Sequence, residues 1–364
     1  MKQSIAFVLP SLNAGGAQRV VSSLANLLVD EYQVHIIALY PCEPFYRLDK
    51  RIKIATCQDT YLLEPTLLQS IKNNYLLVSN LAKNLKKLQI DIAIGFLPAT
   101  NVYTILACKM AKIPSIISER ANPEFNRINK VWHTIRKLVY PYAHCLVVQT
   151  EGTKNYFKHY VNSKIQIIKN PNNTELLDKR DANTPKENII LNVGRLIDLK
   201  NQDLLIRAFS NIKNTDWKVV LLGDGDNFES YKQLISNLGM QDQILLAGNI
   251  KNISEYYNKA KIFAFTSKHE GFPNVIIEAM SYGLACISTN CPYGPSEIIQ
   301  HNVNGMLIPV GDQQALEENL SRLMNDTKLQ AKFSENAKES VEAYSPTEIA
   351  SQWRKLIHKL ITNN

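Results

Sequence analysis

Two carboxylates, Glu270 and Glu278, stand eight positions apart around a Gly-Phe-Pro sequence that opens an apolar helix. Phe263 and Phe265 lie in a short apolar run before them, so Glu270 is predicted just past a strand end, where open α/β sheets bind ligands. Pro273 suits a first helical turn, and the free N–H groups after it attract anions. The spacing predicts a phosphate at the helix start and Glu278 one turn further on, beside a sugar hydroxyl. Ordinary capping of a helix by acidic residues is the alternative.

The bulk composition indicates a globular chain with more than one core. It has 364 residues and 45% hydrophobic content, which suits two domains. No apolar run approaches the roughly 20 residues that span a bilayer, and the first ten residues do not form a signal sequence, so we expect a cytosolic protein. The six cysteines include no C-x-x-C pair, and neither a zinc site nor disulfides are expected.

The net charge of +8 is concentrated in the first half of the chain. Residues 1–170 carry 21 Lys and Arg against 10 Asp and Glu, whereas residues 171–364 carry 20 against 23. This asymmetry predicts contact with an anionic partner: a membrane surface, a diphosphate-bearing acceptor or nucleic acid. The alternative is that the basic side chains only keep the surface well solvated. The local basic clusters are Lys83, Lys86 and Lys87, and Arg127, Lys130, Arg136 and Lys137 around Trp132.

Helical spacing around Trp132 puts Val131, Ile135 and Leu138 on one face with basic residues beside it. Such a helix either lies in a membrane interface or packs on the core with a basic outer face. The sequence leaves both interpretations open.

Short Val- and Ile-rich runs alternate with longer amphipathic stretches, which predicts βαβ units, parallel sheets and an α/β fold. We expect domains at 1–170 and 188–345, a linker at 171–187 and a final helix in 346–364 that packs back on the first domain. Expected strands are 5–9, 34–39, 92–95, 115–118, 145–148 and 165–168, then 189–193, 218–222, 244–246, 262–265, 285–288 and 306–308.

Two more strand-to-helix turns carry groups suited to anions. Gly15 and Gly16 follow the first strand, where glycines allow close approach of a ligand, although the G-x-G-x-x-G pattern is not met. Arg195 and Lys200 follow the strand at 189–193, and two fixed cations there would neutralise a diphosphate. A solvated basic loop is the alternative.

Asp224 and Asp226 in Gly-Asp-Gly-Asp form a potential metal-binding pair, because hard cations prefer paired carboxylates. We favour a glycine turn with Asp226 near a helix start. Pro292–Glu297 is a further strand-to-helix turn, predicted at the same crevice.

Together these turns resemble the family 4 glycosyltransferases of the GT-B fold, in which two Rossmann-like domains face each other across a cleft. The likeness covers residues 4–361 and is strongest over 192–312, where Gly-Phe-Pro-Asn-Val-Ile-Ile-Glu-Ala-Met and Asn-Gly-Met-Leu-Ile-Pro are specific. The resemblance implies that Arg195 and Lys200 bind the donor diphosphate and that Glu270 binds the transferred sugar, and these three are the catalytic candidates. The implied donor-binding residues are Gly15, Gly16, Asn249, Ile250, Phe272, Pro273, Asn274, Val275 and Glu278, the last of them on the ribose.

Within the family, residues 45–48 and 117–122 look like the bacterial enzymes that extend lipid-diphosphate-linked oligosaccharides, including α-1,4-N-acetylgalactosaminyltransferases. Relatives commonly carry a histidine that approaches the sugar where this chain has Arg120. The departure makes Glu119, Arg120 and Asn122 candidates for the acceptor side.

The expected activity is therefore a retaining, metal-independent transfer from a UDP-sugar, the co-substrate, to a lipid-diphosphate-linked glycan acceptor. No cofactor, no metal and no nucleic acid are expected, and the basic half would hold the enzyme peripherally on the inner face of the plasma membrane. Proton transfer to the departing phosphate and a covalent intermediate both remain open. The alternatives are a metal-dependent transferase using Asp224 and Asp226, a hydrolase or phosphorylase, and a non-catalytic module that binds membranes or nucleic acid.

Overall fold

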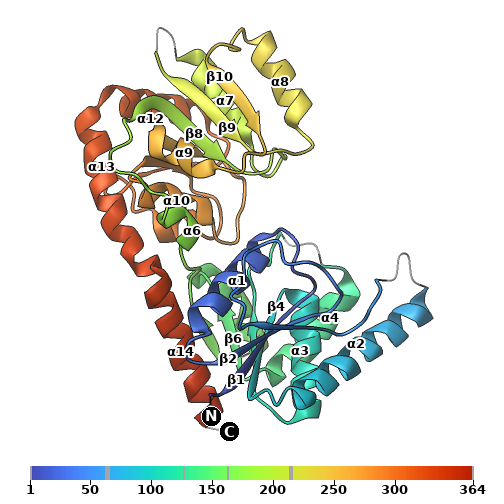
Figure 1. The fold of residues 1–364 in the computed structure, drawn as a ribbon. Coiled ribbons are helices and arrows are strands. Elements are labelled where there is room, and N and C mark those ends of the chain that lie inside the picture. The colour runs from blue at the N-terminus through green and yellow to red at the C-terminus, as the bar shows by residue number, and fades with distance from the viewer. Residues whose placement is uncertain (1, 62–65, 126–127, 162–163, 213–215, 363–364) are drawn as a thin grey trace. The chain divides into compact units, whose positions relative to one another are not determined.

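The computed structural model describes residues 2–61, 66–125, 128–161, 164–212 and 216–362. The chain divides into unit 1, Met1–Pro171 with Pro346–Asn364, and unit 2, Asn172–Ser345 (Figure 1). Each unit contains its own all-parallel sheet, so the predicted α/β class is confirmed.

Unit 1 is built on a seven-stranded sheet of order β3-β2-β1-β4-β5-β6-β7. Its central strands are buried along their whole length because helices cover both faces, as parallel sheets require. Helices α1 and α14 pack on one face, and α2 and α3 on the other. The elements are β1 (Ser4–Leu9), α1 (Gly16–Leu28), β2 (Gln33–Ala38), β3 (Lys53–Thr56), α2 (Leu67–Lys87), β4 (Ile92–Phe96), α3 (Pro98–Ala111), β5 (Ser115–Ser118), α4 (Lys130–Val139), η1 (Tyr140–Tyr142), β6 (Cys145–Val148), α5 (Glu151–Val161), β7 (Ile165–Ile167) and α14 (Pro346–Thr362).

Unit 2 repeats the plan with a six-stranded sheet of order β10-β9-β8-β11-β12-β13. Helices α7 and α12 contribute to the core on one face, and α9 and α10 to the core on the other. The elements are α6 (Thr174–Leu177), β8 (Glu187–Val193), α7 (Gln202–Asn211), β9 (Lys218–Leu222), α8 (Phe228–Asn237), β10 (Ile244–Gly248), α9 (Ile253–Lys259), β11 (Ala260–Phe265), α10 (Asn274–Ser281), β12 (Ala285–Thr289), α11 (Pro295–Ile298), β13 (Met306–Ile308), α12 (Gln313–Asn325), α13 (Thr327–Ser340) and η2 (Val341–Tyr344).

The stretch 171–187, expected as a linker, is packed on unit 2. Leu176 of α6 is buried in the core of that unit, and its carbonyl accepts a hydrogen bond from the Tyr282 hydroxyl. Lys186 Nζ donates to the carbonyl of Tyr257 at 3.1 Å. The two anchors lie 71 and 106 positions away in sequence. Strand β3 was not predicted, since its side chains are mostly exposed and show no apolar run.

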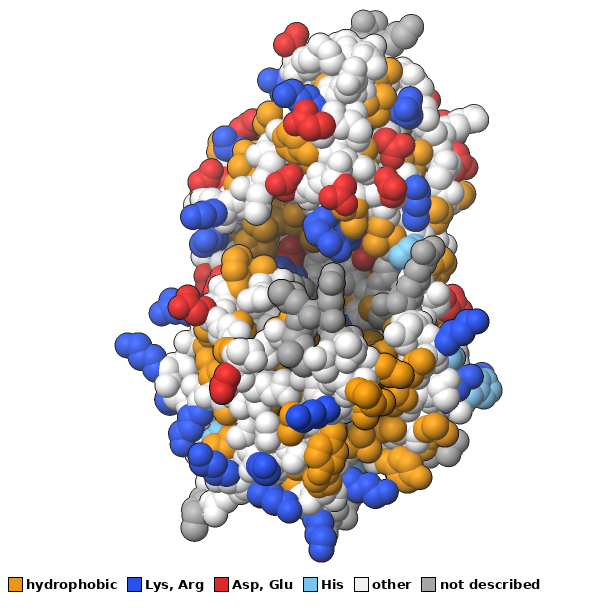
Figure 2. All heavy atoms as spheres, turned by 90° about the vertical axis from the view of Figure 1, so that its right-hand side faces the viewer, with side chains coloured by type: hydrophobic (Ala, Val, Ile, Leu, Met, Phe, Trp, Pro, Cys, Tyr) orange, Lys and Arg blue, Asp and Glu red, His pale blue; other side chains and the backbone are white. Residues whose placement is uncertain are grey.

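The exposed faces of α2 and α4 are partly apolar. Leu67, Leu68, Ile71 and Tyr75 are exposed on α2, which also carries the exposed Lys83, Lys86 and Lys87. Figure 2 shows hydrophobic side chains gathered over the part of unit 1 that carries α2, with Lys and Arg near them. Within the described ranges, no helix combines the length and apolar character needed to cross a bilayer.

Helix α4 differs from the core-facing interpretation of its sequence. Val131 and Leu138 are exposed, whereas Ile135 is half-buried and packs in the core with Tyr140. Arg136, expected on the basic outer face, is buried because its guanidinium lies among aromatic rings. Arg127 falls outside the described residues.

Helix α14 completes one core of unit 1 from the end of the chain. Trp353 is fully buried, and its ring centroid lies 6.3 Å from that of Phe96 in β4. It packs with the apolar face of α1 and with Ile349, Leu356 and Ile357 of its own helix. The core on this face therefore depends on residues more than 300 positions from α1.

We predict that Trp353→Ala lowers the free energy of unfolding of unit 1 by about 3–5 kcal/mol, the usual cost of emptying a buried tryptophan site. Urea unfolding followed by circular dichroism measures it. Lys355→Ala, at an exposed position of α14, is the matched control and should change stability by less than about 0.5 kcal/mol. Coincident unfolding curves for the two variants would contradict the role of α14.

Candidate functional site

The strand order of unit 2 reverses at β8, which lies between β9 and β11. In open parallel sheets this arrangement leaves a crevice outside the carboxyl ends of the two strands on either side of the reversal. The turns that follow β8 and β11 carry Arg195, Lys200 and Glu270, so the sequence-predicted groups meet at this edge.

The turn after β8 is held by backbone contacts with the turn after β9. Gly194 N–H donates to Leu222 O at 2.9 Å, and Leu196 N–H donates to Asp224 O at 2.9 Å. Gly223 has φ +143°, and a Cβ placed there would stand 2.0 Å from Gly194 O. Only glycine permits this approach, and it fixes the backbone on both sides of Arg195. The Arg195 side chain itself is exposed.

Lys200 and Glu270 form an ion pair between the β8 and β11 turns, with Nζ 2.5 Å from Oε1. Both side chains are mostly buried, and Lys200 Nζ lies 5.4 Å from the centroid of the Phe265 ring. The Thr266 hydroxyl donates to Lys200 O at 2.9 Å, and Lys268 N–H donates to Leu199 O at 2.9 Å. These bonds place a cation and a carboxylate together at the predicted crevice.

Helix α10 begins directly after this pair. Its N-cap is Pro273, no side chain caps it, and its first turn holds no acidic residue, so its amino end offers positive charge to an anion. The Asn274 N–H itself donates to Phe272 O at 3.0 Å. Phe272 packs its ring into the core, 6.0 Å from that of Tyr344. Gly294 fits against Pro273 with φ +107°, which brings the predicted turn at 292–297 to the same loop.

Glu278 lies in the interior of α10 and is buried, with 2% of its surface exposed. Its Oε2 accepts a hydrogen bond from the Tyr257 hydroxyl at 3.2 Å. The ring of Tyr282 stacks on that of Tyr257 at 5.2 Å, and burial, with the Glu278 charge as a second cause, raises the pKa of Tyr282 to about 12. Glu278 is therefore anchored inside the protein rather than capping the helix.

Asn249 and Ile250 directly follow β10, at the same carboxyl edge as the other turns of unit 2. Gly223 N–H donates to Gly248 O at 2.8 Å and ties this end of β10 to the β9 turn. Asn249 is exposed, whereas Ile250 packs against the core.

Asp224 and Asp226 lie in a tight turn, as favoured from the sequence. Asp224 Oδ1 accepts a hydrogen bond from Gly225 N–H at 2.8 Å, and a Cβ at Gly225 would stand 2.4 Å from Leu196 O. The N-cap of the next helix is the adjacent residue, Asn227. Among the residues that the structure describes, no group of three His, Cys, Asp or Glu is placed to hold a metal ion.

The glycine pair of unit 1 lies at the start of α1, with Gly15 as N-cap. Gly15 N–H donates to the Tyr46 hydroxyl at 3.4 Å, and Phe45 N–H donates to Leu12 O at 3.0 Å. Apart from its chain neighbours and its own helix backbone, no atom of the described residues lies within 4 Å of a Cβ placed at Gly16, so the turn is open there. The segment at 45–48, singled out by its sequence, thus lies over this turn.

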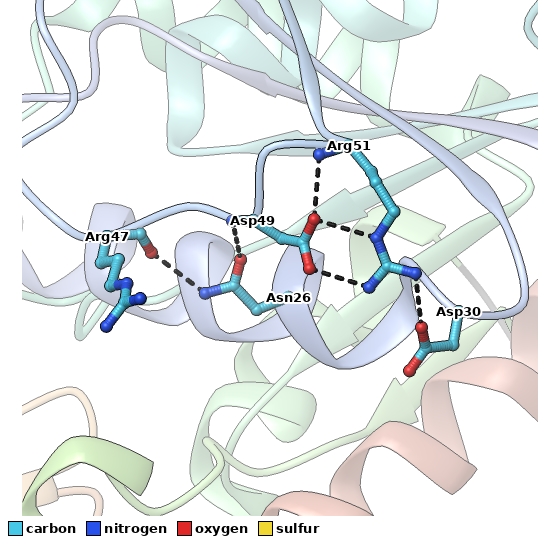
Figure 3. Close-up of polar contacts among 5 residues, drawn as sticks. All are labelled: Asn26, Asp30, Arg47, Asp49 and Arg51. Carbon is cyan, nitrogen blue, oxygen red and sulfur yellow. Dashed lines mark hydrogen bonds and ion pairs between the residues drawn. The ribbon is translucent and has the colours of Figure 1, made fainter.

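Polar contacts fasten that segment to α1 (Figure 3). Asn26 Nδ2 donates to Arg47 O at 3.0 Å, and its Oδ1 accepts from Asp49 N–H at 2.9 Å. Arg51 forms a two-point pair with Asp49 and a further bond to Asp30 at 2.7 Å. The Arg51 guanidinium holds the pKa of Asp49 well below its usual range.

The acceptor-side candidates Glu119, Arg120 and Asn122 follow β5 in unit 1. Glu119 is buried and accepts a hydrogen bond from the Tyr140 hydroxyl, and burial raises its pKa although Arg136 and Tyr140 oppose the shift. Asn122 is buried, and its Oδ1 accepts from Glu124 N–H at 3.0 Å. Both side chains are thus engaged within the unit.

Arg120 links three parts of unit 1. Its Nη1 donates to Asn170 Oδ1 at 2.6 Å, and its guanidinium lies 4.9 Å from the Phe96 ring and 5.9 Å from the Trp353 ring. Burial lowers the pKa of Arg120 to about 9. Arg120 therefore connects β5 to α14 in this chain.

Three residues near the unit 2 site were not predicted. Tyr257 reaches Glu278 from α9, and only the folded chain brings them together. Cys291 is buried near the ion pair, and burial, reinforced by Glu270, raises its pKa to about 12. Burial lowers the pKa of His269, which Glu270 and Lys200 shift in opposite directions. Because His269 adjoins Glu270 in sequence, it was the one of these that sequence inspection could have found.

Two family patterns cover most of the chain. "Glycosyl transferases group 1" matches residues 173–340, and "Glycosyltransferase Family 4" matches residues 14–176.

Full-length relatives are similar at moderate identity. A Campylobacter jejuni enzyme named GalNAc-alpha-(1->4)-GalNAc-alpha-(1->3)-diNAcBac-PP-undecaprenol alpha-1,4-N-acetyl-D-galactosaminyltransferase is 31% identical, over 97% of this chain and 98% of its own. A second C. jejuni enzyme, N-acetylgalactosamine-N,N'-diacetylbacillosaminyl-diphospho-undecaprenol 4-alpha-N-acetylgalactosaminyltransferase, is 28% identical, over 96% of this chain and 97% of its own.

Solved structures share the fold. Anabaena HepE in complex with UDP matches with a TM-score of 0.81 and 18% identity, covering 98% of this chain and all of HepE. A Rickettsia africae glycosyltransferase matches with a TM-score of 0.83 and 21% identity, covering both chains completely. The predicted GT-B class, with two Rossmann-like domains on parallel sheets, is confirmed.

The contact between the β8 and β9 turns generates a stability prediction. We predict that Gly223→Ala lowers the free energy of unfolding of unit 2 by more than about 2 kcal/mol, because it adds an atomic overlap to an unfavourable φ. Gly239→Ala is the matched control: its φ is +66° and no atom lies within 4 Å of the added Cβ, so a loss of about 1 kcal/mol is expected. Thermal unfolding of both variants measures the difference, and equal losses would show that the turns tolerate a side chain.

Proposed function

Because the chain belongs to the family 4 glycosyltransferases, we propose that it moves a hexose or N-acetylhexosamine from a UDP-sugar to a glycan on a polyprenyl diphosphate. The observation that carries the donor assignment is the Lys200–Glu270 pair beside the start of α10, at the strand-order reversal of unit 2. It supplies a cation for a diphosphate and a carboxylate for sugar hydroxyls. The names of the C. jejuni relatives support the acceptor class.

The transfer is proposed to retain the anomeric configuration and to need no metal. Breaking the bond between the anomeric carbon and the phosphate oxygen puts negative charge on the departing UDP. Arg195, Lys200 and the amino end of α10 would face that charge with fixed positive groups, and such preorganised electrostatics lower the barrier. The acceptor hydroxyl oxygen bonds to the anomeric carbon on the same face, and its proton passes to the departing phosphate oxygen.

Glu270 and Glu278 take different parts in this proposal. Glu270, in the loop between β11 and α10 and next to Lys200, would hold hydroxyls of the transferred sugar. Glu278, buried on Tyr257, would hold the ribose, because a carboxylate fixed in orientation accepts hydrogen bonds from a diol with little loss of entropy.

The two ends of the donor site can be separated by mutation. We predict that Arg195→Ala weakens UDP binding roughly tenfold to a hundredfold, the effect of one charge-assisted bond. Glu270→Ala should leave UDP affinity equal or higher, since it releases Lys200, while turnover falls by about a hundredfold or more. Calorimetry with UDP and a product assay measure the two quantities.

Arg322→Ala, at an exposed arginine of α12, is the control and should match the wild type in both assays. Equal losses of UDP affinity in the Arg195 and Glu270 variants would overturn these roles. Formation of free sugar or sugar phosphate in place of the glycan would instead identify a hydrolase or phosphorylase.

The acceptor proposal places unit 1 on the cytoplasmic face of the membrane as a peripheral protein. Exposed apolar side chains of α2, with Lys83, Lys86 and Lys87 on the same helix, support this contact. Apolar groups can enter the interface while lysines meet anionic headgroups.

We predict that the protein sediments with vesicles of anionic lipid and much less with neutral vesicles. Replacing Lys83, Lys86 and Lys87 by Gln should cost about 1 kcal/mol each, or roughly fivefold in partitioning, and the loss should shrink at high salt. Leu67→Ser with Leu68→Ser should weaken binding at every salt concentration, whereas Leu245→Ser, at an exposed position of unit 2, should not. Equal binding to neutral and anionic vesicles would contradict a role of the basic surface in membrane binding.

A further inference from the structure

Unit 1 holds a cavity of about 390 Å³ at the carboxyl ends of β1 and β4. These strands are neighbours where the strand order of this sheet reverses, which is where open α/β sheets receive ligands. The volume lies within the roughly 300–1,000 Å³ of small-molecule sites. Its lining residues are Pro10, Leu97, Pro98, Ala99, Thr100, Ile128, Asn129, Trp132 and Arg136.

One wall is the amino end of α3. Its N-cap is Leu97, with φ 76°, no side chain caps the helix, and its first turn has no acidic residue. A non-glycine residue at such a φ costs energy and recurs at ligand sites. Thr100 is 1% exposed, and its hydroxyl has no hydrogen-bond partner among the described residues. The positive helix end and this hydroxyl both suit an anion.

A second part of the lining is a buried cation. Arg136 of α4 is 2% exposed, and its guanidinium lies 5.1 Å from the Phe157 ring centroid and 5.9 Å from that of Tyr140. Its Nε and Nη1 make no hydrogen bond within the described part of the chain. Glu119 Oε1 stands 3.8 Å from Nη1 and is already bonded to the Tyr140 hydroxyl. The Tyr156 side chain also hydrogen-bonds this guanidinium. Because buried donors left unused are costly, Nε and Nη1 indicate a missing partner.

The ring system of Trp132 completes the cavity. Trp132 is half-buried and meets Tyr103 edge to face at 5.6 Å, and Asn129 fixes the start of α4 by accepting from Trp132 N–H at 2.9 Å. An apolar wall beside two anion-binding walls suits a phosphate that carries a carbon skeleton.

We propose that this cavity binds a phosphate or diphosphate group between the amino end of α3 and the Arg136 fork. The Thr100 hydroxyl and the amides of Ala99 and Thr100 take one side of the anion, and Arg136 takes the other. Assigning the anion to the diphosphate of the lipid-linked acceptor rests on the proposed function, whereas the anion site itself rests on unit 1 alone. Arg136 would then fix the acceptor, and the candidate Glu119, together with Tyr140, would position Arg136.

The test is calorimetric titration of the full-length protein with inorganic pyrophosphate and with geranyl diphosphate, each with saturating UDP to occupy the proposed donor site. Both should bind, and the indole N–H signal of Trp132 should shift while those of Trp217 and Trp353 stay. Ala99→Glu puts a carboxylate in the first turn of α3, where it favours the helix but repels an anion. Affinity should fall roughly tenfold or more, as for a like charge a few ångströms away.

Ala111→Glu makes the same change at the other end of α3 and is the matched control, because both alanines pack at the edge of the same core. It should bind like the wild type, whereas Arg136→Gln should bind roughly tenfold weaker or worse. No binding of either probe, or equal binding to Ala99→Glu and Ala111→Glu, overturns the site.

Binding of pyrophosphate without geranyl diphosphate overturns the assignment to the acceptor and leaves a free-phosphate site. If the wild-type protein bound geranyl diphosphate but not UDP, the proposed function would be contradicted, whereas the proposed anion site in unit 1 would be supported.

Discussion

The close approach of two backbone turns, Gly194 against Gly223, is the constraint on which the site of unit 2 depends. No side chain fits between these turns, so the ends of β8 and β9 are locked together. The lock sets the path of the chain from Arg195 to Lys200, and Lys200 in turn reaches Glu270 from the β11 turn. A site for a highly charged ligand needs such rigidity, because fixed charges stabilise a developing charge without reorganising first.

The Lys200–Glu270 ion pair links the two halves of the proposed donor site. Lys200 is held by Glu270 and lies near the Phe265 ring, so its charge is compensated rather than buried alone. A diphosphate that bound Lys200 would leave Glu270 available for sugar hydroxyls. Donor binding would thus prepare the sugar side of the site, which couples recognition of the two halves of a nucleotide-sugar. In unit 1, by contrast, the Arg136 guanidinium stands 3.8 Å from Glu119 Oε1, hydrogen-bonds Tyr156 and lies among aromatic rings.

Most of the fold was predictable because its information is local. Parallel strands buried on both faces appear as short apolar runs, and all the strands expected at these runs were found, whereas the exposed β3 was not predicted. The turn at Gly223 was predictable because the sequence Gly-Asp-Gly-Asp directly follows an apolar strand. Local sequence does not reveal what lies across the fold, such as the hydrogen bonds of Leu176 with Tyr282 and of Lys186 with Tyr257.

For the site residues too, local sequence predicted their positions but not their contacts across the fold. Arg195, Lys200 and Glu270 could each be assigned to a sheet edge from their own neighbours, but the pairing of Lys200 with Glu270 joins residues 70 positions apart. Arg136 looked like one of several surface cations, because nothing in its helix signals the rings of Phe157 and Tyr140. Burial of a charge is decided by the packing of other elements, and it is such burial that marks the cavity of unit 1.

The central claim is that fixed protein cations support a retaining transfer from a UDP-sugar. The most direct measurement is the anomeric configuration of the first product, by NMR, from α-linked UDP-hexoses and a polyprenyl-diphosphate-linked glycan with a chelator present. The account predicts an α-linked glycan formed at an undiminished rate. A β-linked product, or a reaction that stops until a divalent metal is restored, would contradict it.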